Sequence, residues 1–289
     1  MATVGDTFER KEKKYLISKA QCESIKQSLA GRMRLDDYGR TRIDSLYLDT
    51  PDRLLISRSL EKPLYKEKLR VRSYGPFSNT DVVFVEIKKK YKGVVYKRRV
   101  RMSAQGAAEF CSGALSYEQA QERFPVASRP ETDLAPGKVQ IAREIDAFLH
   151  RYEGLAPSML ISCMREAWCP VGESENDCVE RITFDEDISY VDLMASASAQ
   201  RLRVAGSDQV VMEIKCAGGY PIWLSELLAS HGAFPRSFSK YGNAYKRVLA
   251  NRGAIRVEEK ATGKVSVLGV QTIYPLKDFE LQGRTLLAS

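Results

Sequence analysis

The chain has 289 residues, of which 28% are charged and 44% hydrophobic, a composition typical of a globular protein rather than a disordered one. Its formal net charge of +8 at pH 7 favours an anionic partner such as a nucleic acid, a nucleotide or polyphosphate. No apolar run approaches the roughly 20 residues of a membrane span, and the N-terminus lacks a secretory signal pattern. We therefore expect a cytoplasmic protein with no integral membrane segment.

Cysteine and histidine chemistry is not expected. The six cysteines contain no CxxC pair, and without a secretory signal they are interpreted as reduced thiols rather than disulfides or zinc ligands. The two histidines, His150 and His231, fall in segments with a helical pattern. Two such isolated histidines argue against a histidine-based triad.

The chain opens with a predicted strand and a predicted helix. Residues 8–16 read F-E-R-K-E-K-K-Y-L, in which Glu12 and Lys14 share one face. Ser18 is predicted to cap a helix that ends at Gly31, because serine is a favoured N-cap and glycine commonly ends helices.

A strand over 42–49 is expected to end at a turn that contains Pro51, and three further strands are predicted over 68–72, 82–90 and 94–102. In each of the three, charged residues recur at every second position, and successive side chains of a strand alternate between its two faces. Apolar residues occupy most of the opposite face. The charged face carries Lys68, Arg70 and Arg72 of the first strand, Glu86, Lys88 and Lys90 of the second, and Lys97, Arg99 and Arg101 of the third.

These three strands would form a lattice of positive charge if they lie side by side, with a turn at Gly93 joining the last two. Residues on one face of a strand are about 6.7 Å apart, and neighbouring strands are about 4.8 Å apart. For any single strand the alternative is a solvated outer face, which antiparallel sheets often have. Three rows this basic, however, repel one another across a sheet and predict a polyanion that neutralises them.

Residues 103–152 have a helical pattern. Ser103 is predicted to cap one helix, and a second is predicted over 141–152 after a break at 130–137. We interpret this segment as a helical insertion within a single domain of residues 7–250.

The chain then returns to strands, predicted over 159–168, 179–185 and 209–216. Two short helices are expected over 223–230 and 239–250. The charged or polar residues on these strands are Arg165 on the first, Arg181, Thr183 and Asp185 on the second, and Glu213 and Lys215 on the third. Residues 251–289 form a C-terminal extension of unknown role with a candidate hairpin at Thr262-Gly263.

At least eight strands with one charged face predict an α+β protein. An open sheet would place the charges outside. A closed antiparallel β-barrel of about eight strands, with peripheral helices, would place them inside and would leave no unpaired sheet edge. Charges inside a barrel are costly unless they are paired, so this arrangement predicts a bound anion.

Several segments resemble the CYTH, or triphosphate tunnel metalloenzyme, family. Arg10-x-Glu12-x-Lys14-Tyr15 is similar to the family's opening E-x-E-x-K strand, although Arg10 replaces a glutamate. Later segments look specifically like the VTC branch, the catalytic domain of the vacuolar transporter chaperone polyphosphate polymerase. These VTC-like segments are M-R-E-A-W at 164–168, R-I-T-F-D at 181–185, M-E-I-K at 212–215 and R-S-F-S-K-Y at 236–241, whereas Y-L-D-T-P at 47–51, K-L-R-V-R at 68–72 and V-E-I-K at 85–88 fit the pattern of the wider CYTH family.

The resemblance implies a role for individual residues. It places Glu213 at a metal ligand, for Mn²⁺ or Mg²⁺, Lys240 at the tunnel wall, and Arg236 where the polymerase has a lysine. The residues on positions that bind the triphosphate or the product chain are Lys14, Arg70, Arg72, Lys88, Lys97, Arg165 and Arg181. Further phosphate-binding candidates on the charged faces are Lys68, Lys90, Arg99 and Lys215.

Phosphoryl transfer depends on positioning and charge neutralisation more than on covalent chemistry. We expect ATP to bind with its triphosphate among the cations, and the terminal oxygen of phosphate or of a growing chain to attack the γ-phosphorus. One carboxylate such as Glu213 is enough to hold a divalent metal that takes its other ligands from phosphates. Glu12 and Glu86 either support the metal or serve as salt-bridge partners of the cations.

Three functions remain open from the residues. The first is a nucleotide-dependent polyphosphate polymerase, and the second is a triphosphatase in which water replaces the chain end. The third is a protein that binds polyphosphate, or RNA, without turnover. The basic faces carry few aromatic residues for base stacking, which argues against nucleic acid. The expected partners are therefore ATP and pyrophosphate or polyphosphate, while protein partners cannot be inferred.

Overall fold

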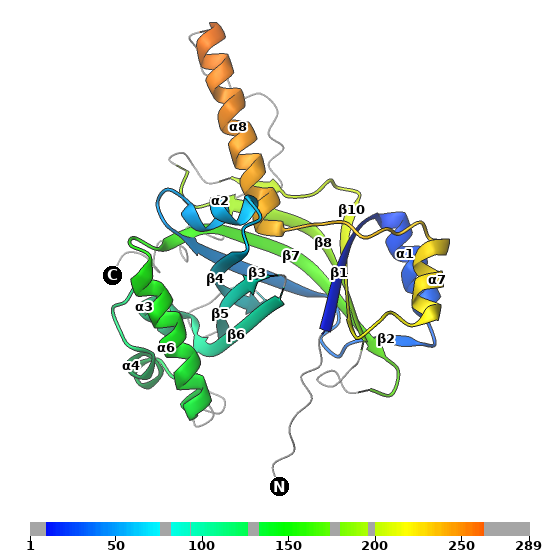
Figure 1. The fold of residues 1–289 in the computed structure, drawn as a ribbon, viewed down its shortest axis with the longest axis horizontal. Helices are drawn as coiled ribbons and strands as arrows, with labels where there is room; N and C mark the ends of the chain where they lie inside the picture. Colours follow the sequence, from blue (N-terminus) through cyan, green and yellow to red (C-terminus); the bar gives the residue numbers. More distant parts are fainter. Residues whose placement is uncertain are drawn as a thin grey trace. The chain divides into compact units, whose positions relative to one another are not determined.

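The alternating strands and amphipathic helices of the sequence form an α+β fold with a large antiparallel sheet (Figure 1). The computed structural model describes residues 10–75, 82–92, 94–126, 133–173, 180–195 and 200–262. The chain divides into two compact units. Unit 1 comprises Met1–Thr41, Cys163–Ile188 and Ala205–Ser239, and unit 2 comprises Arg42–Ser162, Ser189–Val204 and Lys240–Ser289.

Unit 1 contains a set of antiparallel strands with helices on one face. Strand β1 (Arg10–Ser18) pairs with β10 (Gln209–Ala217), which pairs with β8 (Glu180–Asp192). The short β2 (Met33–Leu35) pairs with β7 (Ala156–Pro170). Helices α1 (Lys19–Leu29) and α7 (Ile222–Ser230) complete the unit.

The core of unit 1 lies between these helices and the apolar face of the strands. Buried residues of α1 and α7, such as Ile25 and Leu224, pack in one cluster with Tyr15, Phe184 and Met212 of the strands. Because side chains alternate along a strand, the residues between these core positions point to the other face. That second face carries Glu12 and Lys14 of β1, Arg181 and Asp185 of β8, and Glu213 and Lys215 of β10.

Unit 2 is built on the four strands β3 (Thr41–Asp49), β4 (Tyr65–Tyr74), β5 (Val82–Tyr91) and β6 (Val94–Ser103), paired antiparallel in sequence order. A short strand, β9 (Arg201–Arg203), pairs with β8. The helices of the unit are α2 (Leu54–Leu60), α3 (Ala104–Cys111), α4 (Tyr117–Arg123), α6 (Pro136–Arg151) and α8 (Lys240–Thr262).

The core of unit 2 lies between the strands and α3, α4 and α6, which stand together beside β5 and β6 in Figure 1. Val83, Val85 and Ile87 of β5 are fully buried against Phe110 of α3 and Ile145 of α6. The alternate residues of β5 lie on the other face of the strand. The sequence pattern predicted this division of β5 correctly.

The strands follow the order β1-β10-β8-β7-β3-β4-β5-β6 in a single sheet, with β7 and β8 running through both units. The predicted fold class and the peripheral helices are confirmed. The sheet is not shown closed into the predicted barrel, so closure stays a prediction.

Most predicted elements are present with shifted ends. Ser18 caps α1 with a reciprocal bond to Gln21, and Ser103 caps α3, as predicted. The final helix, predicted to stop at Ala250, continues to Thr262. The predicted turn at Gly93 and the hairpin beyond Thr262 lie outside the described residues.

Four short elements were not predicted, namely β2, α2, α4 and β9. Each spans at most seven residues, too few for a clear hydrophobic period. No helix in the described part of the chain combines the length and apolar character that crossing a membrane requires.

Candidate functional site

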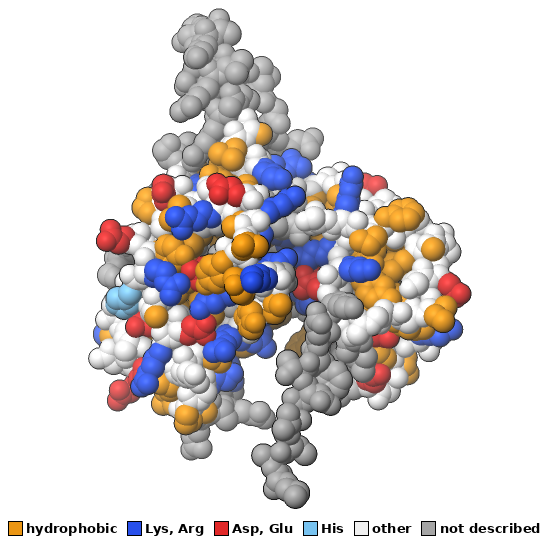
Figure 2. Space-filling model, in the orientation of Figure 1, with side chains coloured by type: hydrophobic (Ala, Val, Ile, Leu, Met, Phe, Trp, Pro, Cys, Tyr) orange, Lys and Arg blue, Asp and Glu red, His pale blue; other side chains and the backbone are white. Residues whose placement is uncertain are grey.

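In unit 2, β4, β5 and β6 place positively charged side chains opposite one another on the face away from α3, α4 and α6. The register sets Lys68 opposite Lys88, and Lys88 opposite Lys97, so three lysines form one row across the strands. Figure 2 shows many Lys and Arg side chains over this unit. We define the cationic face as Lys68, Arg70, Arg72, Glu86, Lys88, Lys97 and Arg99.

Glu86 lies at the centre of the cationic face and is only 1% exposed. Arg70 donates from Nε to Oε2 at 2.7 Å, and Lys97 Nζ lies 2.7 Å from Oε1. Arg72 and Arg99 approach the same carboxylate at 3.9 and 3.8 Å. Burial raises the pKa of Glu86, but Arg70, Arg72 and Lys97 outweigh it and lower the pKa to about 2. Glu86 is therefore ionised and holds four cations in place.

The cationic face has far more positive than negative charge. The structure describes β4, β5 and β6 in full. Glu86 is the one carboxylate that these three strands direct to this face. Directly opposed like charges destabilise a sheet. Burial lowers the pKa of Lys97, and the charges of Arg70 and Arg72 act in the same direction against the effect of Glu86. A surface of this kind is stabilised by binding an anion.

Arg70 is held from two sides. Its Nε and Nη2 atoms contact Glu86, and Nη1 donates to Tyr47 Oη at 3.1 Å. The ring of Tyr47 stacks on Tyr241 with centroids 4.3 Å apart, and Tyr241 Oη donates to the buried Asp49 at 2.7 Å. Since a guanidinium has five N–H groups in a fixed plane, these bonds orient the donors that remain.

Tyr47 has an unusual acidity for a buried tyrosine. Burial raises its pKa, but the charges of Arg70, Lys68 and Arg72 act more strongly together and lower the pKa to about 7. The field of the cationic face is thus strong enough to stabilise a negative oxygen in a buried position. A phosphate oxygen at the same face would experience the same field.

Unit 1 has a second charged group, which we call the Glu213 cluster and define as Glu12, Lys14, Thr183, Glu213 and Lys215. The register sets Lys14 and Thr183 on either side of Glu213, and Glu12 opposite Lys215. Lys215 Nζ lies 2.8 Å from Glu213 Oε1, and Lys14 Nζ lies 3.6 Å from Oε2. Lys14 Nζ also contacts Glu12 at 3.3 Å.

Glu213 fits a divalent cation that takes its other ligands from phosphates. Burial raises its pKa, but Lys215, Lys14 and Arg165 outweigh burial and hold the pKa well below its ordinary value. Thr183 Oγ1, opposite Glu213, is buried without a hydrogen-bond partner among the described residues. Carboxylate and hydroxyl oxygens are hard ligands that suit Mg²⁺ and Mn²⁺.

Two predicted arginines of unit 1 are tightly paired. Arg165 donates from Nε and Nη2 to the two oxygens of the fully buried Asp185, at 2.6 and 2.7 Å. Arg181 donates from Nη2 to Asp36 Oδ2 at 2.7 Å. The Arg165–Asp185 pair is bidentate, an arrangement that is strong and fixes the guanidinium plane. Sequence analysis did not assign a role to Asp185 or Asp36.

The remaining predicted residues lie at the margins of these groups. Lys90 is an exposed residue of β5, two positions beyond Lys88. Arg236 is exposed, and its backbone nitrogen donates to Lys14 O at 2.6 Å. Lys240 is the first residue of α8 in unit 2.

Cys22, Glu23 and Glu186 form a group of ligand atoms close enough for a metal. However, Lys26 Nζ lies 3.4 Å from Glu23 and 3.5 Å from Glu186. Burial raises the pKa of Cys22 to about 12, so the thiol is protonated at neutral pH. A protonated thiol is a poor metal ligand, so we assign no metal site to this group.

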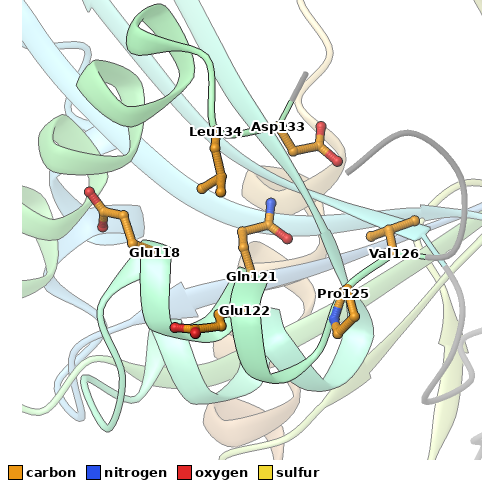
Figure 3. Close-up of a pocket in the computed structure, with 7 residues that line it drawn as sticks. All are labelled: Glu118, Gln121, Glu122, Pro125, Val126, Asp133 and Leu134. Carbon is orange, nitrogen blue, oxygen red and sulfur yellow. The ribbon is translucent and has the colours of Figure 1, made fainter. Parts of the chain in front are cut away.

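A pocket of about 460 Å³ lies in unit 2 beside α4 (Figure 3). Its lining includes the acidic residues Glu118, Glu122 and Asp133 and the apolar Val126 and Leu134. Negative charge of this kind repels phosphates. The pocket is therefore not the candidate site.

Sequence analysis missed the aromatic residues of the site. Tyr47 and Tyr241 belong to the quoted motifs but received no role. Phe84 was predicted to share the charged face but also received no role, and Tyr74 was not considered. The two-residue alternation that identified Arg70 and Arg72 includes Tyr74, so the signal was present in the sequence.

The chain matches the family model described as VTC domain over residues 9–249. This range contains all of the motifs quoted from the sequence. No curated protein matches the chain.

Three solved structures have a distant similarity to the chain. One is a candidate adenylate cyclase from Vibrio parahaemolyticus, with TM-score 0.39, 12% identity, and coverage of 83% of this chain and 97% of that chain. A second, from Hippeastrum, is described as a candidate adenylyl cyclase with a dominant triphosphatase activity (TM-score 0.45, 13% identity, 81% and 94% coverage). A third is a Pyrococcus horikoshii protein (TM-score 0.39, 13% identity, 83% and 99% coverage). We base no functional inference on these distant similarities.

Proposed function

The chain belongs to the VTC domain family, as its match over residues 9–249 shows, and on that basis we propose that it is a polyphosphate polymerase. In the proposed reaction, the γ-phosphoryl group of ATP passes to a terminal oxygen of phosphate or of a growing polyphosphate chain. The bond between the γ-phosphorus and its bridging oxygen breaks, and ADP leaves. The closed barrel and the cytoplasmic location predicted from the sequence remain part of this proposal.

The cationic face is the observation that supports a phosphate chain as the ligand. Lys68, Lys88 and Lys97 lie in one row, although like charges in register weaken a sheet. A polyphosphate carries a regular series of negative oxygens that would neutralise such a row. Arginine forks and lysine ammonium groups bind non-bridging phosphate oxygens.

A divalent metal, Mn²⁺ or Mg²⁺, is proposed to bind at Glu213. When bound, it would neutralise negative charge on the phosphates as a Lewis acid. Glu213 is ionised and is flanked by Lys14 and Lys215, which would hold phosphate oxygens next to it. Thr183 offers a further oxygen.

The residues of the chain act by positioning and by charge. Glu86 and Tyr47 orient Arg70, and Asp185 orients Arg165, so these cations are fixed before substrate arrives. Preorganised cations stabilise the charge that develops on the transferred phosphoryl group without reorganising during the reaction.

The pairing of the carboxylates favours a chain end over water as the nucleophile. Both oxygens of Glu213 lie near lysines, and Asp185 and Asp36 are held by Arg165 and Arg181. A carboxylate neutralised by a cation is a weak base for activating water. Triphosphatase activity is therefore the second candidate.

The test is to incubate the purified protein with ATP, Mn²⁺ and a trace of pyrophosphate and to resolve the products on a gel. Long chains together with ADP would support the polymerase. Orthophosphate without chains would identify a triphosphatase. Tight polyphosphate binding without any turnover would identify a binding protein.

We expect Glu213→Gln to weaken Mn²⁺ binding in the presence of tripolyphosphate by more than about tenfold. Removing a residue that only orients a metal ligand already lowers metal affinity by about tenfold, and Glu213 is proposed to be a ligand itself. Calorimetric titration of Mn²⁺ measures this without requiring turnover. Glu180→Gln is the matched control, because Glu180 lies on β8 opposite Cys216, on the core face. Equal Mn²⁺ affinity in wild type and Glu213→Gln would show that Glu213 is not a ligand.

A further inference from the structure

One end of the cationic face is aromatic. On β4, Tyr74 follows Lys68, Arg70 and Arg72 at the same two-residue spacing, so it lies on the same face of the strand. Phe84 of β5 lies opposite Arg72. The row of cations on β4 therefore ends at a pair of aromatic rings.

The two rings form a supported platform. Tyr74 and Phe84 pack edge to face, with centroids 5.8 Å apart and an interplanar angle of 84°. The guanidinium of Arg99 lies 4.3 Å from the centre of the Phe84 ring, which is the geometry of a cation–π contact. Tyr74 is nevertheless 48% exposed. Phe84, which Arg99 contacts in turn, thus supports Tyr74 from one side, and part of the Tyr74 ring stays accessible.

The spacing along β4 suits a nucleoside triphosphate. Tyr74 is four residues from Arg70, which corresponds to about 13 Å along an extended strand. An extended nucleoside triphosphate separates its base from its terminal phosphate by a comparable length. A triphosphate bound at Arg70 and Arg72 would therefore bring its base to the Tyr74 ring.

We propose that Tyr74 is a nucleobase-stacking residue, which makes the phosphoryl donor a nucleoside triphosphate rather than inorganic polyphosphate alone. This inference rests on the proposed function, because it requires the triphosphate to lie on the cationic face. Any of the nucleobases can stack on a tyrosine ring, because every base has a flat π-face. A single aromatic pair at one end suits one base, whereas a nucleic acid strand would need several.

The test compares two ligands on wild-type protein and on Tyr74→Ala by calorimetry: a non-hydrolysable ATP analogue and inorganic tripolyphosphate. Loss of one stacked base should lower the affinity for the ATP analogue by about 5- to 150-fold, which corresponds to about 1–3 kcal/mol. The affinity for tripolyphosphate should not change. Tyr74→Phe keeps the ring and should bind both ligands as wild type does.

Tyr91→Ala is the matched control, because Tyr91 is 47% exposed on β5 but lies on the opposite face, paired with Tyr65. It should leave both affinities unchanged. The inference is overturned if Tyr74→Ala weakens both ligands equally, or weakens neither, while wild type binds both. If wild-type protein binds neither ligand, the proposed function itself fails.

Discussion

Replacing Glu86 by glutamine is expected to lower the free energy of unfolding by about 3 kcal/mol, because removing one partner of a buried ion pair leaves its cations uncompensated. Four cations, Arg70, Arg72, Lys97 and Arg99, lie within 4 Å of this carboxylate. Urea unfolding in a buffer of monovalent salts measures the loss. A polyanion should then act as a substitute for the missing charge.

Tripolyphosphate is therefore expected to raise the stability of Glu86→Gln more than that of wild type. A ligand that binds the folded state stabilises it in proportion to the logarithm of its concentration over its dissociation constant. Glu144→Gln is the control, since Glu144 pairs with Lys89 and Arg98 near the surface and an exposed pair contributes little. A Glu86→Gln protein as stable as wild type without polyanion would contradict this account.

The difference in stability between wild type and Glu86→Gln should depend on pH. The pKa of Glu86 is about 2 in the folded state, below its ordinary value of 4.5. A lowered carboxyl pKa contributes stability that is fully present above the unfolded value and is lost as the pH falls toward the folded value. The difference should therefore shrink between pH 4.5 and pH 2.

Replacing Lys88 by alanine is expected to reduce turnover by about 100-fold or more, the effect of removing one preorganised charge-stabilising donor from an active site. Its stability should stay the same or increase, because Lys88 lies in register between Lys68 and Lys97 and its removal relieves like-charge repulsion. Steady-state kinetics with ATP and thermal unfolding of the same preparation measure the two effects. A loss of turnover together with an unchanged or increased stability distinguishes a substrate-binding lysine from a structural one.

Lys89→Ala is the matched control for Lys88→Ala. Lys89 is the next residue on β5 and points to the opposite face, where its Nζ lies 2.6 Å from Glu144. Turnover should be unchanged in this variant. Undiminished turnover in Lys88→Ala, or equal loss in both variants, would remove the cationic face from the proposed site.

Local sequence predicted the faces of the strands well. In β5, the alternation separates Val83, Val85 and Ile87 from the charged face, and all three are buried. The same alternation placed Arg70 and Arg72 of β4 on the charged face. Alternation of side chains is a property of the strand itself, so it needs no knowledge of the partner strand.

Short elements escaped prediction because tertiary packing stabilises them. Helix α2 begins after Arg53, whose backbone is left-handed with φ of 59°, and it contacts β4 and α8. A helix of seven residues is too short to be stable alone. Its neighbours in the fold, rather than its own sequence, determine that it forms.

The sequence by itself determined which residues are charged, which face of each strand they occupy and where α1 and α3 begin, because these properties depend on neighbours within a few residues. Only the tertiary structure decided which of them meet. It set Lys14 opposite Glu213, Glu86 among four cations, and Asp185 against Arg165. Strand register depends on how two distant apolar faces pack together, and a shift of one residue would move each side chain to the other face.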